Sequence, residues 1–214
     1  MELFKINQIE LKNQTIHTLE FNSFQITKFF DLLTTQEFER ATSFKSVKRQ
    51  QEFVATRILR HEIFGFNHIE YNEVGAPYIK DEGFISISHA DGIVGIALNK
   101  NYEVSLDLET IDNKAMRLRE KFLSDQEKEK LDIDSPIEMT KVWSLKEVLY
   151  KLSGKKGLHF KEQLLLEKKS TENWVGRIIY EDTIIEVELY TFVKEEVIIS
   201  CNTGKKKIIH NGLR

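Results

Sequence analysis

The chain contains a single cysteine and lacks any long uncharged apolar run. Cys201 cannot form an intramolecular disulfide on its own, and a lone thiol is typical of a reducing compartment. No stretch approaches the about 20 apolar residues of a membrane-spanning helix. The first residues, Met-Glu-Leu-Phe-Lys, include an early acid and lack the apolar core of a secretory signal. We therefore expect a cytoplasmic protein without a membrane partner.

An excess of charge of one sign is also missing. The 31 Lys and Arg residues nearly balance the 34 Asp and Glu residues, which gives a net charge of −3. We therefore expect no nucleic-acid partner, because a general polyanion binder carries a positive excess. The hydrophobic content of 41%, with 14 Phe, is ample for a core in a chain of 214 residues. The composition predicts one large domain or two small domains that share a core.

The first half predicts strands with helices between them. Residues 27–44 have helical character in two pieces, and Ser46 is a suitable N-cap for a longer helix that ends at Gly65. The turn Gly75-Ala76-Pro77 follows. Alternating or β-rich runs predict strands over residues 2–11, 15–21, 69–72, 84–89 and 93–99, with residues 12–14 as the first turn.

The second half predicts helices followed by antiparallel strands. A helix over residues 113–121 precedes Ser124 and Glu127, whose spacing is that of a capping box. Ser135 and Glu138 have the same spacing around Pro136 and predict a helix that runs to Ser153 and stops at Gly154. Short alternating runs then predict strands over residues 163–167, 174–180, 184–190 and 197–201, and residues 205–207 are expected to be a frayed basic end.

Two acids stand out in the run Val104-Ser105-Leu106-Asp107-Leu108-Glu109. The alternation predicts a half-buried strand, on which Asp107 and Glu109 point to the same side. Neighbouring carboxylates repel each other, and their oxygens are the ligands that Mg²⁺ prefers. The alternative is a solvated strand end with two acids that do nothing more.

The predicted helix over residues 135–153 has two faces. Val142, Leu145, Leu149 and Leu152 form an apolar stripe for the core. Trp143, Glu147 and Lys151 share a second face at i, i+4 and i+8, where Glu147 and Lys151 could form an exposed ion pair worth roughly 0.3–0.5 kcal/mol. The tryptophan favours partial burial of this face, so both charges would need partners there.

The ordered motifs resemble those of the phosphopantetheinyl transferase superfamily, in its long pseudodimeric, surfactin-synthetase-activating type. Residues 104–109 resemble the family's Gly-hydrophobic-Asp-x-Glu strand, and residues 143–151 resemble its Trp-x-x-Lys-Glu-Ala/Ser-x-x-Lys helix. The Gly-Ala-Pro-Tyr turn, the Phe84–His89 run and Phe122-Leu123-Ser124 followed by Glu127 agree in order. Two positions depart from the motifs: Ser105 replaces a glycine, and Ala76 replaces the turn's lysine.

The resemblance implies an α+β fold of two similar halves, each a small antiparallel sheet packed on a long helix. We place the halves at residues 1–101 and 102–214 and expect a monomer. It also implies a reaction, the Mg²⁺-dependent transfer of the 4′-phosphopantetheine arm of coenzyme A to a serine of an apo acyl or peptidyl carrier protein. Adenosine 3′,5′-bisphosphate is the other product, and Mn²⁺ can substitute for Mg²⁺.

The resemblance also assigns residues to roles. Asp107, Glu109 and Glu147 would hold the metal, Glu147 would take the serine proton, and Lys151 would neutralise the leaving phosphate. The residues expected to bind coenzyme A are Arg49, Arg57, Gly75, Pro77, Ser88, His89 and Lys151.

Plainer interpretations stay open for several of these residues. The helix that carries Arg49 and Arg57 also carries Lys48 and Arg60, and such basic residues usually form a solvated face. His89 could be a hydrogen-bonded core histidine. The apolar set Met116, Leu118, Phe122 and Leu123 is either a carrier-docking surface or part of the core. At the level of the whole protein, a non-catalytic relative that binds coenzyme A or a carrier, and an unrelated Mg²⁺-dependent phosphohydrolase, are the alternatives.

Overall fold

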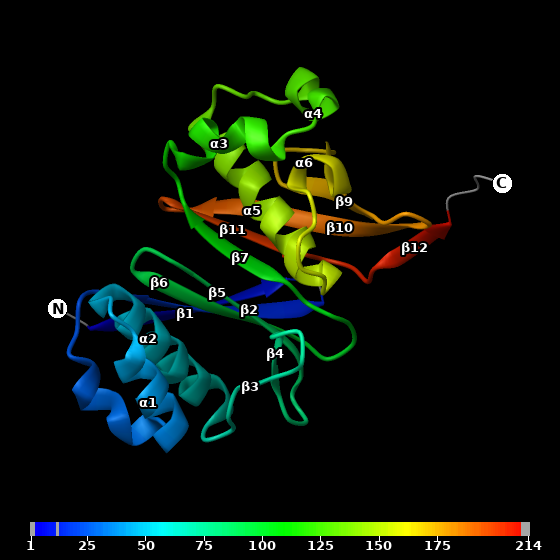
Figure 1. The fold of residues 1–214 in the computed structure, drawn as a ribbon. Helices are drawn as coiled ribbons and strands as arrows, with labels where there is room; N and C mark the ends of the chain where they lie inside the picture. The colour runs from blue at the N-terminus through cyan, green and yellow to red at the C-terminus, as the bar shows by residue number, and fades with distance from the viewer. Residues whose placement is uncertain (1–2, 12, 211–214) are drawn as a thin grey trace.

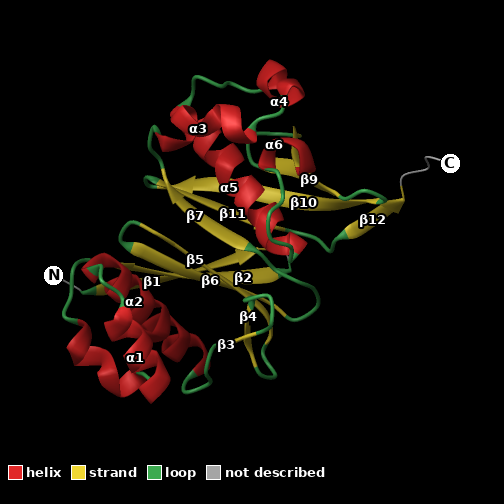
Figure 2. Ribbon diagram, viewed as in Figure 1, coloured by secondary structure: helices red, strands yellow, loops and turns green. Residues whose placement is uncertain are grey.

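The computed structural model describes residues 3–11 and 13–210, which form four layers. Two antiparallel sheets lie face to face in the middle, and helices cover the outer side of each (Figures 1 and 2). The first sheet consists of residues before Lys100, and the second consists of residues after Ser105. The predicted α+β class with two halves is thus confirmed, although each sheet has six strands and is larger than expected.

The first sheet has the strand order β1-β2-β6-β5-β4-β3. Its strands are β1 (Phe4–Leu11), β2 (Gln14–Phe21), β3 (Glu70–Tyr71), β4 (Pro77–Ile79), β5 (Gly83–Ala90) and β6 (Ile93–Asn99). The predicted strand over residues 69–72 shrinks to two residues, and Pro77 of the predicted turn instead begins a strand. Residues 2 and 12, which were placed in a strand and a turn, lie outside the described residues.

Helices cover the outer face of this sheet. The predicted two-piece helical region is a 3₁₀ helix, η1 (Ile26–Leu32), followed by α1 (Thr35–Ser43). The long helix α2 (Val47–Phe64) begins after Ser46, whose hydroxyl accepts from the Arg49 N–H, and ends at Gly65, as predicted. Apolar residues of α2, such as Val54 and Leu59, pack on Val94 and Ile96 of β6.

The second sheet has the order β7-β11-β10-β9-β8, and β12 also pairs with β10. Its strands are β7 (Leu106–Thr110), β8 (Leu164–Lys168), β9 (Asn173–Ile179), β10 (Thr183–Lys194), β11 (Val197–Asn202) and β12 (Lys207–His210). The predicted frayed tail is wrong at Lys207, where β12 begins and pairs with the first residues of β10. Lys206 also forms an ion pair with Glu103.

The second group of helices packs on this sheet. They are α3 (Lys114–Phe122), α4 (Asp125–Lys130), α5 (Pro136–Ser153) and the short α6 (Phe160–Gln163), which the sequence did not predict. The capping box of Ser124 and Glu127 is complete. At α5, Ser135 accepts from the Glu138 N–H, but the Glu138 carboxylate pairs with Lys168, so only half of the second predicted box forms. Gly154 ends α5 in the left-handed region, as predicted.

An apolar core fills the space between the two sheets. Leu106 and Leu108 of β7 meet β6 at Gly95, where an added Cβ would lie 3.0 Å from a methyl group of each leucine. Cys201 lies in the same core and is fully buried, and burial raises the pKa of its thiol to about 12. A thiol in this environment stays protonated and behaves as a small apolar side chain.

Two serine hydroxyls join the halves beside this core. The N–H groups of Leu106 and Leu108 point away from β11 and donate to Ser86 Oγ at 3.0 Å and Ser88 Oγ at 3.1 Å. β7 is an edge strand, and these bonds satisfy amides that would otherwise be buried without partners. The ends of β5 and β7 are therefore held side by side.

No helix within the described part of the chain is long and apolar enough to cross a membrane.

Gly176 of β9 sets how closely α5 approaches the second sheet. An added Cβ would lie 2.6 Å from a methyl carbon of Leu149 and 2.7 Å from one of Leu189, both of which are buried. Overpacking of this kind typically costs about 1–3 kcal/mol. We expect Gly176→Ala to lower the melting temperature by several degrees, as measured by circular dichroism, since about 1 kcal/mol corresponds to roughly 2–4 °C in a chain of this size.

The matched control is Gly204→Ala, where the nearest atom to the new Cβ is the tip of Glu188 at 3.4 Å. This variant should melt within about a degree of the wild type, because a 3.4 Å contact is ordinary packing. A Gly176→Ala protein that melts at or above the wild-type temperature would contradict the close approach.

Candidate active site

β7 and α5 bring predicted residues together at the joint between the sheets. Asp107 of β7 is buried, and its Oδ1 accepts from Lys151 Nζ of α5 at 2.9 Å. Lys151 also donates to the carbonyl of Leu106 at 2.7 Å. Lys151 thus forms its ion pair with Asp107 of β7. The interpretation that Lys151 forms an exposed ion pair with Glu147 is wrong.

Ser88 adds the first half of the chain to this group. Its hydroxyl donates to Asp107 Oδ1 at 3.2 Å, accepts from the Leu108 N–H, and lies 3.3 Å from Lys151 Nζ. One oxygen atom of β5 therefore contacts groups of β7 and α5 at once. A displacement of either half would break this set of bonds.

Glu109 lies next to Asp107 on the same side of β7. Its Oε1 accepts from Trp143 Nε1 at 2.8 Å, and the Trp143 ring is held against Phe122 and Phe160, each with a centroid distance of 5.4 Å. Burial and, to a smaller extent, the charge of Asp107 raise the pKa of Glu109, although the Trp143 bond opposes the shift. The partial burial expected for the Trp143 face is confirmed.

Glu147 is the most strongly perturbed carboxyl in this group. Burial and, to a smaller extent, repulsion from Asp107 and Glu109 raise its pKa from 4.5 to about 7, although Lys151 opposes the shift. A carboxyl that titrates near neutral pH can both accept and release a proton under physiological conditions. Perturbed acids of this kind are typical of functional sites.

A buried ion pair on the other side of α5 fixes the helix. Lys146 is fully buried and donates to Glu127 at 2.8 Å and to the carbonyl of Phe160 at 3.1 Å. The hydroxyl of Ser105, just before β7, donates to the carbonyl of Val148 at 3.1 Å. The serine that replaces the motif glycine is accommodated and ties β7 to α5.

Asp107, Glu109 and Glu147 provide the oxygen ligands of a divalent-metal site, but their carboxylates are not yet close enough together to bind a metal ion. Asp107 Oδ2 is buried and has no hydrogen-bond partner within the described residues. Burial and mutual repulsion disfavour the charged forms of Glu109 and Glu147, which a cation would stabilise. Across residues 3–11 and 13–210, however, no group of three or more His, Cys, Asp or Glu side chains is close enough to form a ready metal site.

A second polar group lies on the first half of the chain. Arg49 of α2 lies 2.6 Å from His89 Nε2 of β5 and forms an ion pair at 3.1 Å with Glu52, which is buried. Burial lowers the pKa of His89, and the positive charges of Arg49 and Lys151 add to this effect. His89 is two-fifths exposed, so its interpretation as a core histidine is wrong.

The solvated-face interpretation of the α2 basic residues is wrong for two of them. Arg57 is buried, pairs with Glu37 at 2.9 Å and lies 3.9 Å above the ring of Phe53. Arg60 is fully buried and donates to the carbonyls of Leu32 and Asn67. These two arginines fasten α2 to its neighbours, whereas Lys48 is exposed and pairs with Asp91.

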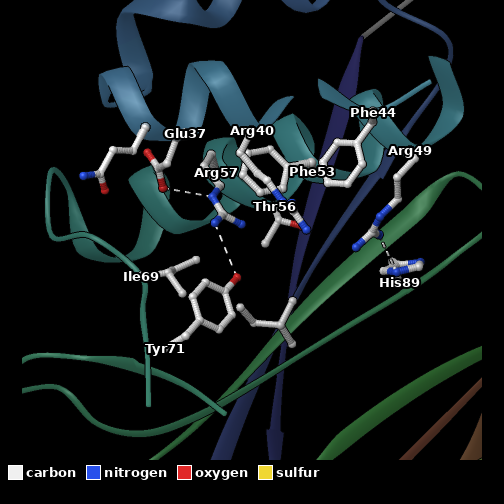
Figure 3. Close-up of a pocket in the computed structure, with 12 residues that line it drawn as sticks. Glu37, Arg40, Phe44, Arg49, Phe53, Thr56, Arg57, Ile69, Tyr71 and His89 are labelled. Atoms are coloured by element: carbon white, nitrogen blue, oxygen red, sulfur yellow. Dashed lines mark hydrogen bonds and ion pairs between the residues drawn. The ribbon is translucent and has the colours of Figure 1, made fainter. Parts of the chain in front are cut away.

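Two adjoining cavities open beside these residues. One, of about 560 Å³, spans both halves and contains the predicted residues Gly75, Pro77, His89, Arg49 and Lys151. The other, of about 520 Å³, lies between α1, α2 and β5, and Figure 3 shows Arg40, Arg49 and Arg57 around it. They share four lining residues, which are Arg49, Tyr71, Ile87 and His89.

Three cations at these cavities were not predicted. Lys155 and Lys156, just after α5, line the larger cavity, and Arg40 of α1 lines the smaller one. No carboxylate is among the described residues that line the larger cavity. Lys155 and Lys156 directly follow a helix stop at Gly154, which was the available signal. Arg40 gave no signal, because α1 is far from the acidic motifs in the sequence.

The structure separates the residues predicted to dock a carrier. Phe122 and Leu123 are completely buried in the core beneath α5, so the core interpretation is confirmed for both. Met116 and Leu118 pack on the same core but stay partly exposed. Only the latter pair remains available to a docking partner.

The comparisons with known proteins bear on the second half of the chain. Residues 103–201 match the model of the 4′-phosphopantetheinyl transferase superfamily. The matched residues include Asp107, Glu109, Glu147 and Lys151. A search of curated proteins finds no match for the chain. Arg49, Ser88 and His89 precede the matched residues, so the structure alone connects them to the acidic residues within the match.

The raised pKa of Glu147 predicts a pH-dependent stability. Between the ordinary pKa of 4.5 and the folded value of about 7, the folded protein holds a proton that the unfolded chain has released. The contribution of Glu147 is therefore most favourable below pH 4.5 and is lost as the pH rises through 7. We expect Glu147→Gln to raise the melting temperature at pH 8, relative to the wild type, by more than it does at pH 5.

Melting should be followed in chelator, so that no divalent cation contributes. Glu62→Gln, which makes the same change at an exposed position of α2, is the control and should show no such pH trend. A constant difference between Glu147→Gln and the wild type across this range would contradict the assigned environment of Glu147.

Proposed function

We propose that the protein transfers the 4′-phosphopantetheine arm of coenzyme A to a serine of an apo acyl or peptidyl carrier protein. The observation that carries the proposal is the ion pair between Lys151, which lines the larger cavity, and Asp107, because it joins this cation-lined cavity to the acidic group of β7 and α5. A ligand that carries several phosphate groups along its length could contact both at once. The superfamily match supports the same reaction class.

The cavities suit the phosphates of coenzyme A. The larger cavity presents Arg49, Lys151, Lys155 and Lys156, together with His89, along its length. Arginine and lysine are the usual partners of phosphate oxygens. We assign the pyrophosphate to the end near Lys151 and the 3′-phosphate to the end near Arg49 and His89. Arg40 is a more accessible phosphate partner than Arg57, whose guanidinium is already paired with Glu37.

Asp107, Glu109 and Glu147 would hold Mg²⁺, or Mn²⁺ in its place. The unpartnered Asp107 Oδ2 and the two destabilised glutamates fit a hard divalent cation. Bound there, the cation supplies positive charge to pyrophosphate oxygens. The arrangement in the structure keeps Asp107 on Lys151, so loading the site requires the three carboxylates to come closer together.

The chain's own residues account for the proton and the leaving group. The serine oxygen of the carrier attacks the phosphorus that bears the pantetheine arm, and the bond from that phosphorus to the bridging oxygen breaks. Glu147, with a pKa of about 7 in the free protein, takes the serine proton directly or through a water molecule. Lys151 neutralises the phosphate that leaves as part of adenosine 3′,5′-bisphosphate.

Further details belong to the same proposal. We assign the chain to the long pseudodimeric type, with halves at residues 1–101 and 102–214, working as a cytoplasmic monomer. The support is that each half contributes one six-stranded sheet and one 18-residue helix, α2 or α5. The ligand cavity lies between the halves, so neither half would be sufficient alone.

The proposal predicts strict dependence on a divalent cation. Transfer of a fluorescent coenzyme A arm to an apo carrier should vanish in EDTA and return when Mg²⁺ or Mn²⁺ is added in excess. The physical reason is one of charge. The two phosphates of the pyrophosphate would lie beside three carboxylates, and the single positive charge of Lys151 cannot balance all of them. Undiminished transfer after complete chelation would remove the metal from the proposal.

Substitutions on α5 separate a transferase from a non-catalytic binder. Glu147→Gln and Lys151→Ala should each lower turnover by on the order of a hundredfold or more, as loss of a general base or a charge stabiliser does. Folding should survive, because buried Val142, Leu145 and Leu149 carry the packing of α5. Glu181→Gln, at an exposed turn, is the control.

Turnover and melting temperature should be measured on the same samples, together with coenzyme A binding by calorimetry. Near-normal turnover in both α5 variants would overturn the mechanism. Coenzyme A binding by a wild type that transfers nothing to any carrier in a panel would instead identify the non-catalytic relative.

A further inference from the structure

A buried carboxylate lies among the cations of the first half. Glu52 of α2 is only 6% exposed, and its Oε2 is 3.1 Å from the Arg49 guanidinium and 3.4 Å from His89 Nδ1. It lies outside residues 103–201, and its sequence context did not single it out. Burying a carboxylate is costly unless it is paired, and an apolar residue would pack at this position on α2 without that cost.

The contacts of His89 define how Glu52 acts on it. A guanidinium can only donate, so His89 Nε2, at 2.6 Å from Arg49, accepts. The ring proton of neutral His89 is then on Nδ1, the atom that faces Glu52. In the free protein, His89 Nε2 therefore has no proton to offer a phosphate oxygen. Because Glu52 favours the proton on Nδ1, an incoming phosphate gains a donor at Nε2 most readily when His89 takes up a second proton.

We propose that Glu52 is a positioning residue for the anion site, which holds Arg49 and the Nδ1 edge of His89 so that His89 takes up a proton when a phosphate group binds. The positioning role stands on these contacts alone, whereas the choice of a phosphate ester as the ligand rests on the proposed function. Protonated His89 lies between two anions, Glu52 at Nδ1 and the phosphate at Nε2. Arg49 turns its guanidinium from Nε2 to the phosphate.

The charges around His89 determine how easily it takes up a proton. Arg49 and Glu52 face it from α2, Lys151 from α5 and Asp107 from β7. Burial, Arg49 and Lys151 lower the pKa of His89, and Glu52 is the largest opposing influence. Removing the charge of Glu52 leaves the cations unopposed, so His89 becomes harder to protonate. Figure 3 shows His89 and Arg49 together at one end of the smaller cavity, and both residues also line the larger cavity.

The first experiment needs no ligand. The ¹⁵N and ¹³C shifts of His89 should be followed by NMR through a pH titration of the wild type, Glu52→Gln, Glu52→Ala and the control Glu62→Gln. We expect the Nδ1–H tautomer in the wild type and a lower His89 pKa in both Glu52 variants. Glutamine keeps a polar oxygen beside Nδ1 and should keep the tautomer, whereas alanine should give a mixture.

If His89 has the same pKa in both Glu52 variants as in the wild type, the proposal is wrong. If Glu52→Ala does not fold, the pKa of His89 in Glu52→Gln decides, because glutamine preserves the shape and changes only the charge.

The second experiment uses adenosine 3′,5′-bisphosphate as the probe, with its affinity measured by calorimetry from pH 5.5 to 8.5. The ionisation of the probe is the same for every protein, so a difference between variants reports on the protein. We expect the affinity of Glu52→Gln to fall at a lower pH than that of the wild type, by the same interval as the His89 pKa, whatever the absolute affinity. If the affinities of the wild type and Glu52→Gln fall at the same pH, Glu52 does not influence proton uptake by His89 on binding.

The two experiments distinguish this inference from the proposed function. A wild type that fails to bind the bisphosphate contradicts the proposed function, and the ligand-free titration still tests Glu52. A wild type that binds it, but whose His89 is indifferent to Glu52, leaves the proposed function in place and removes Glu52 from it.

Discussion

The structure depends on how the outward-facing amides of β7 are satisfied. β7 pairs with β11 on one side only, and on the other side Ser86 and Ser88 take the place of a neighbouring strand. A buried amide without a partner costs free energy comparable to a lost hydrogen bond, so a displacement of one sheet against the other that leaves these amides buried but unpaired is unfavourable. The same contact puts Asp107 beside Ser88. The site thus results from the way in which the sheets are joined.

Much of the fold is local enough to be predicted from the sequence. Ser46 and Gly65 bound α2, and Ser135 and Gly154 bound α5, because caps act on the backbone within a few residues of themselves. β12 is different. Its residues, 207–210, begin with a lysine that continues the basic run before it. They form a strand because they pair with the first residues of β10. Pairing between distant segments leaves no trace in either segment alone.

The same limit applies to the site. The spacing within β7 and within α5 was sufficient to place Asp107 with Glu109 and Trp143 with Glu147, and the family resemblance connected the two elements. The spacing could not show that Arg57 would be neutralised by Glu37, which lies on a separate helix. Nor could it show that Glu52 would be buried against His89, because that contact joins α2 to the end of β5. From the sequence alone, charged residues on one helix are interpreted as a solvated face, because their partners on other elements are not known.

The buried thiol of Cys201 has a practical consequence for measuring motion between the halves. Maleimide and related reagents react with thiolates, and a thiol in the core with a pKa of about 12 offers almost no thiolate at neutral pH. The native cysteine can therefore stay in place when two new cysteines are introduced, one on an exposed position of α2 and one near the end of α5. Fluorescent dyes or spin labels on that pair would report the separation of the two helices as ligands enter the cavity between them.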